Sequence, residues 1–203
     1  MRLFLLLPAM LLVSACSDSS TQTTTKAPEK PVEPITGRHA FQNTYPSARM
    51  WSGDSEPLQI RSLLLDQIKS ENGKAGAWEI TYASAQKASS RAFTWSAVEA
   101  EGNLHQGVFG GSQDSWDPTR GPQTPFVAAA LKIDTDVALE TATMKAADYL
   151  KKPGEKPPVN FILEMVPRFP DPAWRVFWGA NPGSAEFTVF VDATTGKVLS
   201  IVR

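Results

Sequence analysis

The chain has 203 residues, of which 42% are hydrophobic, and its 20 Lys and Arg nearly balance its 21 Asp and Glu, for a formal net charge of −1. This balance leaves no electrostatic footprint for nucleic acid, so we expect no nucleic-acid partner. The single Cys excludes an intrachain disulfide and a cysteine-based zinc site. The hydrophobic fraction is typical of a globular protein and argues against wholesale disorder.

The N-terminus has the layout of a secretory signal peptide. Arg2 precedes an apolar run over residues 3–13, and the small residues Ser14 and Ala15 follow it. The run is shorter than the roughly 20 apolar residues that a transmembrane helix needs. Residues 1–15 are therefore predicted to be a signal peptide that is removed from the mature chain.

The segment Val13-Ser14-Ala15-Cys16 resembles a bacterial lipobox. The resemblance implies signal cleavage between Ala15 and Cys16, diacylation of the Cys16 thiol and acylation of the new amine. Two or more acyl chains anchor a protein stably, so we expect a lipoprotein that reaches the membrane through its lipid. The residue after the Cys is Ser17 rather than Asp, which favours the outer membrane, facing the periplasm, in a cell with two membranes. An ordinary signal peptide with a chance Cys is the alternative.

Residues 16–34 are predicted to be a disordered tether, because they are rich in Ser, Thr and Pro and contain no aromatic residue. The rest of the chain is predicted to form two units. The first covers residues 35–122 and includes a connecting loop, and the second covers residues 123–203.

One helix is expected in each unit. The first is predicted from Glu56 to Glu71, with Ser55 as its cap and Pro57 in its first turn. The second is predicted from Asp136 to Lys152, where Pro153-Gly154 ends it.

Short alternating or apolar segments follow each helix and predict antiparallel hairpins. They cover residues 78–82, 91–100 and 104–109 in the first unit, and 159–166, 174–178, 186–192 and 197–202 in the second. The predicted fold class is therefore α+β, with two similar units, each a helix packed on an antiparallel β-sheet.

The two units share sequence features that predict an internal repeat. Ala77–Tyr82 parallels Ala173–Trp178, and Ser90–Val108 can be laid on Ser184–Val202 without gaps. The alternative is two unrelated meanders that share only the alternation of any half-buried sheet.

The C-terminal unit resembles the end of a PepSY domain. The resemblance rests on the strand with Trp174, on the strand that ends in Val191-Asp192-Ala193 and on the turn at Thr195-Gly196. It covers about residues 131–203, and residues 35–113 would be a more diverged copy. It implies a helix on an antiparallel sheet, an inhibitory or chaperone-like role, and no catalytic residues.

No residue set in the sequence indicates a catalytic site, and we expect no enzymatic activity. The two histidines, His39 and His105, are expected to be surface residues. The sequence contains neither a Gly-x-Ser-x-Gly nucleophile elbow nor a phosphate-binding Gly-x-x-x-x-Gly-Lys-Ser/Thr motif. We expect no cofactor and no metal site, and a hydrolase is only the third interpretation.

Four residues are candidates for binding. Trp116, Asp117 and Arg120 lie in the long connection of residues 110–122 and offer stacking and hydrogen bonding to a sugar or peptide. The alternative is an interdomain linker whose Trp packs on one domain. Trp178 lies on a strand that is apolar on both faces, so one face is a candidate for contact with the other unit or with a partner.

The function predicted from the sequence is non-enzymatic binding of an envelope protein or peptide by a lipid-anchored protein, with protease inhibition as one form of it. The sheet edge is the physical basis for such binding, because an extended segment can join it as a strand. A structural envelope lipoprotein without a specific ligand is the alternative.

Replacing Cys16 by Ala should abolish the incorporation of radiolabelled palmitate, because the lipobox resemblance makes its thiol the acyl acceptor. Ser17→Ala serves as the control and should keep the label. Label that survives Cys16→Ala would overturn the predicted lipid anchor.

Overall fold

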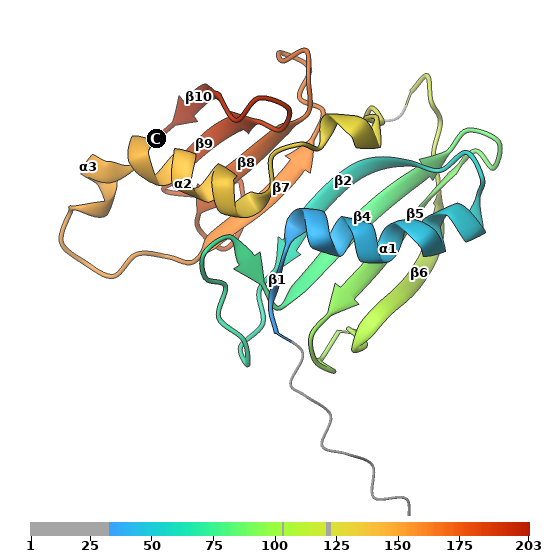
Figure 1. Cartoon of the computed structure of the whole chain (residues 1–203), viewed down its shortest axis with the longest axis horizontal. Coiled ribbons are helices and arrows are strands. Elements are labelled where there is room, and N and C mark those ends of the chain that lie inside the picture. Colours follow the sequence, from blue (N-terminus) through green and yellow to red (C-terminus); the bar gives the residue numbers. More distant parts are fainter. Residues whose placement is uncertain (1–32, 103, 121–122) are drawn as a thin grey trace, which may run out of the picture. The chain divides into compact units, whose positions relative to one another are not determined.

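The computed structural model describes residues 33–102, 104–120 and 123–203. Within these residues the chain forms ten strands, three α-helices and one 3₁₀ turn (Figure 1). In chain order the elements are β1 (Ile35–Thr36), α1 (Gly37–Trp51), β2 (Glu56–Leu63), β3 (Lys74–Ala75), β4 (Ala77–Ser84), β5 (Ser89–Ser96), β6 (Gly107–Ser115), η1 (Ala128–Ala130), α2 (Thr135–Lys145), α3 (Ala147–Leu150), β7 (Val159–Glu164), β8 (Ala173–Trp178), β9 (Phe187–Asp192) and β10 (Val198–Val202).

Eight of these strands form one antiparallel sheet, in the order β10-β9-β8-β7-β2-β4-β5-β6. At its middle, β2 pairs with β7 and so joins the strands of the first half of the chain to those of the second. Helix α1 packs on β4 and β5, and α2 packs on β8 and β9. Figure 1 shows both helices on the same face of the sheet. The predicted α+β class is confirmed, and the two halves share one sheet and one hydrophobic core.

The helix predicted over Glu56–Glu71 is wrong. Its first eight residues form the strand β2, in which Leu58 and Ile60 are buried whereas Gln59 is half-buried and Arg61 is exposed. This spacing of two is the period of a strand, and the leucines that follow made it look helical. Pro57 lies beside a β-bulge, where its missing N–H does not interrupt the ladder.

Helix α1 was not predicted, because residues 37–51 contain many polar side chains and lie close to the segment predicted to be a tether. Its helical signal is the spacing of the buried positions, which are Gly37, Ala40, Phe41, Thr44 and Ala48. Thr36 caps the helix by accepting a hydrogen bond from the His39 N–H.

The second predicted helix is confirmed in position but is divided. Helix α2 begins one residue earlier than predicted, after the N-cap Asp134, and the helix breaks at Ala146 before the short α3. The predicted strands agree with β4, β5 and β7–β10 apart from their ends. The strand predicted over residues 104–109 instead runs from Gly107 to Ser115, so half of the predicted connecting loop belongs to β6.

The N-termini of α1 and α2 meet above the middle of the sheet. One carboxylate serves both helices: Asp134 Oδ1 accepts from the N–H groups of Thr135 (2.7 Å) and Arg38 (2.9 Å), and Oδ2 accepts from the Thr36 hydroxyl (2.6 Å). The Gly37 N–H in turn donates to Thr135 Oγ1 at 3.0 Å. The start of α1 is therefore capped by groups from the other half of the chain, and the same Asp134 carboxylate caps α2.

Two buried indoles repeat the same contact in the two halves. Trp78 Nε1 donates to the Ile35 carbonyl at 2.9 Å, and Trp174 Nε1 donates to the Ile133 carbonyl at 2.8 Å. Each acceptor lies two residues before the start of a helix. The similarity of Ala77–Tyr82 to Ala173–Trp178 thus coincides with equal positions in the structure.

The gapless alignment of Ser90–Val108 on Ser184–Val202 does not follow the strand pairing. It matches Phe93 with Phe187, yet Phe93 lies opposite Ile80 whereas Phe187 lies opposite Trp178. The position equivalent to Phe93 is Val189, which lies opposite Val176. The sequence alignment is therefore shifted by two residues from the structural equivalence. An origin of the two halves by duplication stays a prediction.

Replacing Gly37 by Ala should lower the free energy of unfolding by about 1–3 kcal/mol, because overpacking a filled core forces side chains to shift. A Cβ at this position would lie 2.7 Å from the Trp174 ring and 3.1 Å from the Trp78 ring. The matched control is Gly53→Ala, whose added Cβ meets nothing within 4 Å. Equal urea midpoints for the two variants would contradict the close packing at Gly37.

Candidate functional site

Two of the residues singled out from the sequence, Ala15 and Cys16, lie outside the described residues. Signal cleavage and lipidation there stay predictions.

Trp116 follows directly on β6 and is buried, with 8% of its surface exposed. It packs against Leu58 and Ala83 in a small cluster of its own. Its Nε1 is buried and has no hydrogen-bond partner. The ring face is therefore not available for stacking, in accordance with the alternative that this Trp packs on the domain.

Asp117 and Arg120 are both exposed beyond the end of β6. The Asp117 carboxylate accepts from the backbone N–H and the hydroxyl of Thr119, at 2.8 and 2.7 Å. These hydrogen bonds hold the pKa of Asp117 below its usual value. Its carboxylate therefore stabilises a local turn.

Trp178 is part of the core under α3. It is 3% exposed and packs edge-on against Tyr149 and Phe187. Burial, and then the hydrogen bond that Tyr149 donates to Glu186 at 3.0 Å, raise the pKa of Tyr149 to about 12. Trp178 lies on β8, which four other strands separate from β6 in the sheet order, so the structure does not bring the four candidates together.

The most strongly shifted carboxyl is Asp54, in the turn between α1 and β2. It accepts hydrogen bonds from the hydroxyls of Ser52 and Ser84, both at 2.6 Å, and from the Gln86 N–H at 2.9 Å. These bonds lower the pKa of Asp54 well below its usual range. The cluster ties the end of α1 to the β4–β5 hairpin.

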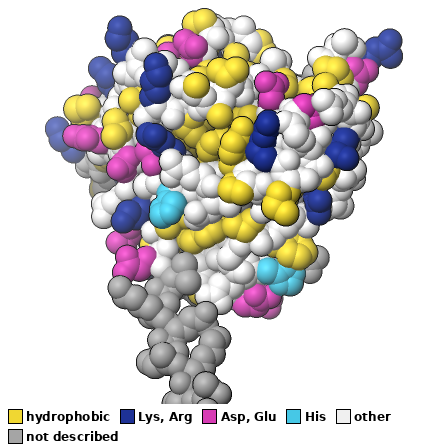
Figure 2. Space-filling model, turned by 45° about the vertical axis from the view of Figure 1, so that its right-hand side comes forward, with side chains coloured by type: hydrophobic (Ala, Val, Ile, Leu, Met, Phe, Trp, Pro, Cys, Tyr) yellow, Lys and Arg dark blue, Asp and Glu magenta, His cyan; other side chains and the backbone are white. Residues whose placement is uncertain are grey.

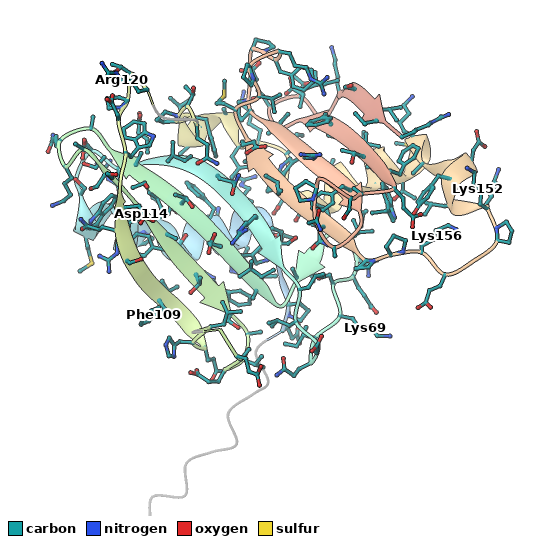
Figure 3. All side chains as sticks on the ribbon, turned by 180° about the vertical axis from the view of Figure 1, so that it is seen from behind. Lys69, Phe109, Asp114, Arg120, Lys152 and Lys156 are labelled. Carbon is teal, nitrogen blue, oxygen red and sulfur yellow. The ribbon has the colours of Figure 1, made fainter. Side chains whose placement is uncertain are left out.

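The feature that the sequence did not reveal is the edge strand β6. It is nine residues long and most of its residues are exposed, including Val108 (39%) and Phe109 (43%). Figure 3 shows Phe109 and Asp114 along this outer strand, with Arg120 beyond its end. An edge strand presents a row of unpaired backbone N–H and C=O groups, which another chain can pair with.

The other edge strand, β10, has more of the features that normally protect an edge from pairing with another chain. It is only five residues long, contains a register shift, and lies between Lys197 and Arg203. Strand β6 contains no Lys, Arg or Pro, and Asp114 is its one charged residue. Its register also shifts, at the point where Arg91 donates to the Gly110 and Gly111 carbonyls. Short length and flanking cations protect an edge, so β6 is the more accessible of the two.

Side chains from neighbouring elements fix the conformation of β6. Arg91 Nε donates to the Gly111 carbonyl at 2.8 Å beside the register shift between β5 and β6. Trp51 Nε1, at the end of α1, donates to Gln113 Oε1 at 2.6 Å. These contacts hold the edge in an extended conformation, and a preformed edge lowers the ordering cost of pairing with another chain.

A side-chain contact between His105 and Glu99 lies just before β6. His105 Nδ1 and Glu99 Oε1 are 2.7 Å apart, and the His105 ring lies 4.4 Å from the Phe109 ring. The Gln106 N–H and then His105 hold the pKa of Glu99 below its usual value. The contact orients the Phe109 ring on the face of the sheet that carries no helix.

Two kinds of feature are absent from the described residues. These residues contain no helix long and apolar enough to cross a membrane. Within the same residues, no three His, Cys, Asp or Glu side chains lie close enough to hold a metal ion.

Trp78→Phe should lower the free energy of unfolding more than Trp116→Phe, by about 1–2 kcal/mol. Both changes remove an indole N–H and similar volume, but Trp78 loses its bond to the Ile35 carbonyl, whereas Trp116 Nε1 has no partner to lose. Urea unfolding of the two variants measures the difference. Equal losses would show that the Trp116 indole N–H has a stabilising partner.

No known family model matches the chain, and no curated protein is similar to it in sequence. Its structure is similar to the crystal structure of a putative lipoprotein from Clostridium difficile 630. The match covers 86% of this chain and 95% of that chain, with a TM-score of 0.53 and 10% sequence identity. At this identity, the similarity shows a shared fold.

Proposed function

We propose that this chain is a lipid-anchored protein of the bacterial cell envelope whose folded part binds an extended segment of another protein at the β6 edge, without catalysing a reaction. The lipobox-like residues around Cys16 support the anchor. A further support is that the protein of similar fold is described as a putative lipoprotein. Ser17 favours the outer membrane, facing the periplasm, in a cell with two membranes.

The observation that carries the binding function is the difference between the two sheet edges. An incoming segment can hydrogen-bond to the free backbone groups of β6, which supply affinity whatever the sequence of the segment. The nine residues of β6 have the length of a full strand, although the Gly110 and Gly111 carbonyls already accept from Arg91. At β10 the same approach meets a shorter strand with cationic residues at both ends.

Side chains on the two faces of β6 would select the partner. Val108 lies opposite Trp95 of the core, on the face with the helices, and Phe109 lies opposite Thr94, on the other face. An added strand therefore meets one exposed apolar side chain on each face. Apolar residues at neighbouring positions of the partner would cover both.

Protease inhibition is the specific form of this function that the PepSY-like resemblance favours. A segment of a protease that binds to the sheet as an added strand is held extended. It can then no longer make its usual contacts within the protease.

The test is a photo-crosslinking experiment in the native envelope. With p-benzoylphenylalanine in place of Phe109, the full chain should form a saturable crosslink to one partner. The same residue in place of Ile201, which is 39% exposed on β10, is the matched control and should not form that crosslink. Phe109→Lys should abolish capture of the same partner, and Ile201→Lys should not.

Equal crosslinking at the two edges would overturn the assignment to β6. Capture of abundant envelope components alone, unchanged by Phe109→Lys, would favour a structural lipoprotein without a specific ligand.

A further inference from the structure

A separate cleft lies on the side of the sheet that carries the helices. It has a volume of about 310 Å³ and is formed by the first turns of α1 and by the segment around η1. Helix α1 contributes Arg38, Phe41 and Gln42, and the other wall contains Leu131 and Lys132 together with two alanines, Ala128 and Ala129. Figure 2 shows this side, where hydrophobic side chains are exposed among basic, acidic and uncharged ones.

The floor of the cleft is apolar. Phe41 (6% exposed) and Leu131 (5% exposed) both belong to the main hydrophobic core, which fixes their position. Ala128 and Ala129 add small apolar groups on the opposite wall. The volume is at the lower end of the range of about 300–1,000 Å³ that small-molecule sites occupy.

The polar groups of the cleft are cationic or neutral. Arg38 and Lys132 are both exposed, and Arg38 Nη1 is held in place by the Lys132 carbonyl at 3.3 Å. No acidic residue is among the described residues that line the cleft. The nearby Asp134 does not line it, and its oxygens accept from Thr36, Arg38 N–H and Thr135 N–H.

We propose that this cleft binds a short apolar group that ends in a carboxylate. The Arg38 guanidinium and the Lys132 ammonium would take the carboxylate, and charge-assisted hydrogen bonds of this kind are among the stronger ones in proteins. The apolar body of the ligand would lie against Phe41 and Leu131 and be removed from water. The cleft shares no residue with the β6 edge, so the proposal for the cleft and the proposal for β6 can be tested and rejected separately.

Two sources carry this chemistry: the C-terminus of a peptide that ends in an aliphatic residue, and a short fatty acid. Gln42 distinguishes them, because its carboxamide can accept a hydrogen bond from a peptide N–H, which a fatty acid lacks.

The experiment titrates the full chain, in a neutral detergent, with Gly-Gly-Leu and with hexanoate. Alanine methyl NMR signals report binding, since Ala128 and Ala129 line the cleft. The matched controls are Gly-Gly-Leu-amide and hexan-1-ol, which keep the apolar body and lack the charge. We expect both carboxylates to shift these signals and their neutral counterparts to bind about tenfold more weakly or not at all.

Lys132→Met should weaken carboxylate binding about tenfold, because it removes the charge and keeps an apolar stem. It should not disturb the fold, since the contacts of Lys132 to Ala193 and Arg38 are made by its backbone. Arg49→Gln, at the other end of α1 and outside the cleft, is the control and should bind normally.

Added salt should weaken binding, because the two cations are exposed. Gln42→Leu should weaken binding of Gly-Gly-Leu alone if the natural source is a peptide, and leave hexanoate unaffected. Equal binding of the carboxylates and their neutral counterparts, or unchanged binding by Lys132→Met, would overturn the proposal. Signal shifts confined to alanines outside the cleft would also overturn it.

Discussion

The shared capping of two helix starts by Asp134 is the constraint on which the rest of the structure depends. The first N–H groups of a helix have no partner inside it, and burial without partners is costly. Here one carboxylate accepts from the N–H groups of Arg38 and Thr135, which belong to different helices. The position of one helix start therefore fixes that of the other, and the two half-sheets that the helices cover are fixed relative to each other in the same way.

The close approach of the helix starts also explains the glycine at the start of α1. A side chain at Gly37 would collide with Trp78 and Trp174, which come from opposite halves of the sheet. Both indoles use their N–H on a carbonyl just before a helix, so the ring positions and the helix positions determine each other. The short β2–β7 pairing, with three residue pairs, is thus supported by a shared core on one face.

Much of the second half could be predicted from the sequence, because its signals are local. Asp134 caps the helix, apolar strands follow it along the chain, and Gly196 at positive φ forms the last turn. The first half was harder because the spacing of two in β2 is followed by leucines that suggest a helix. Helix α1 buries small and polar side chains such as Ala40 and Thr44, which carry little hydrophobic signal.

The candidate site could not be predicted for a different reason. Whether a strand lies at an edge depends on the order of all strands in the sheet, which no local pattern contains. Trp116 illustrates the same limit, because a Trp beside a carboxylate in a polar segment suggests an exposed ring. Its contacts to Leu58 and Ala83 come from strands distant in sequence and bury it.

The place where the chain enters the fold has a mechanical consequence. If the chain is anchored at its N-terminus and bound at β6, as we propose, a pull from the partner acts as tension at Ile35, which pairs with Ala75 of β3 and accepts from Trp78 of β4. Load therefore enters beside the middle of the sheet, two strands inward from β6. The path from β6 to Ile35 crosses the long β4–β5 and β5–β6 ladders and does not pass through the short β2–β7 junction, which such tension spares.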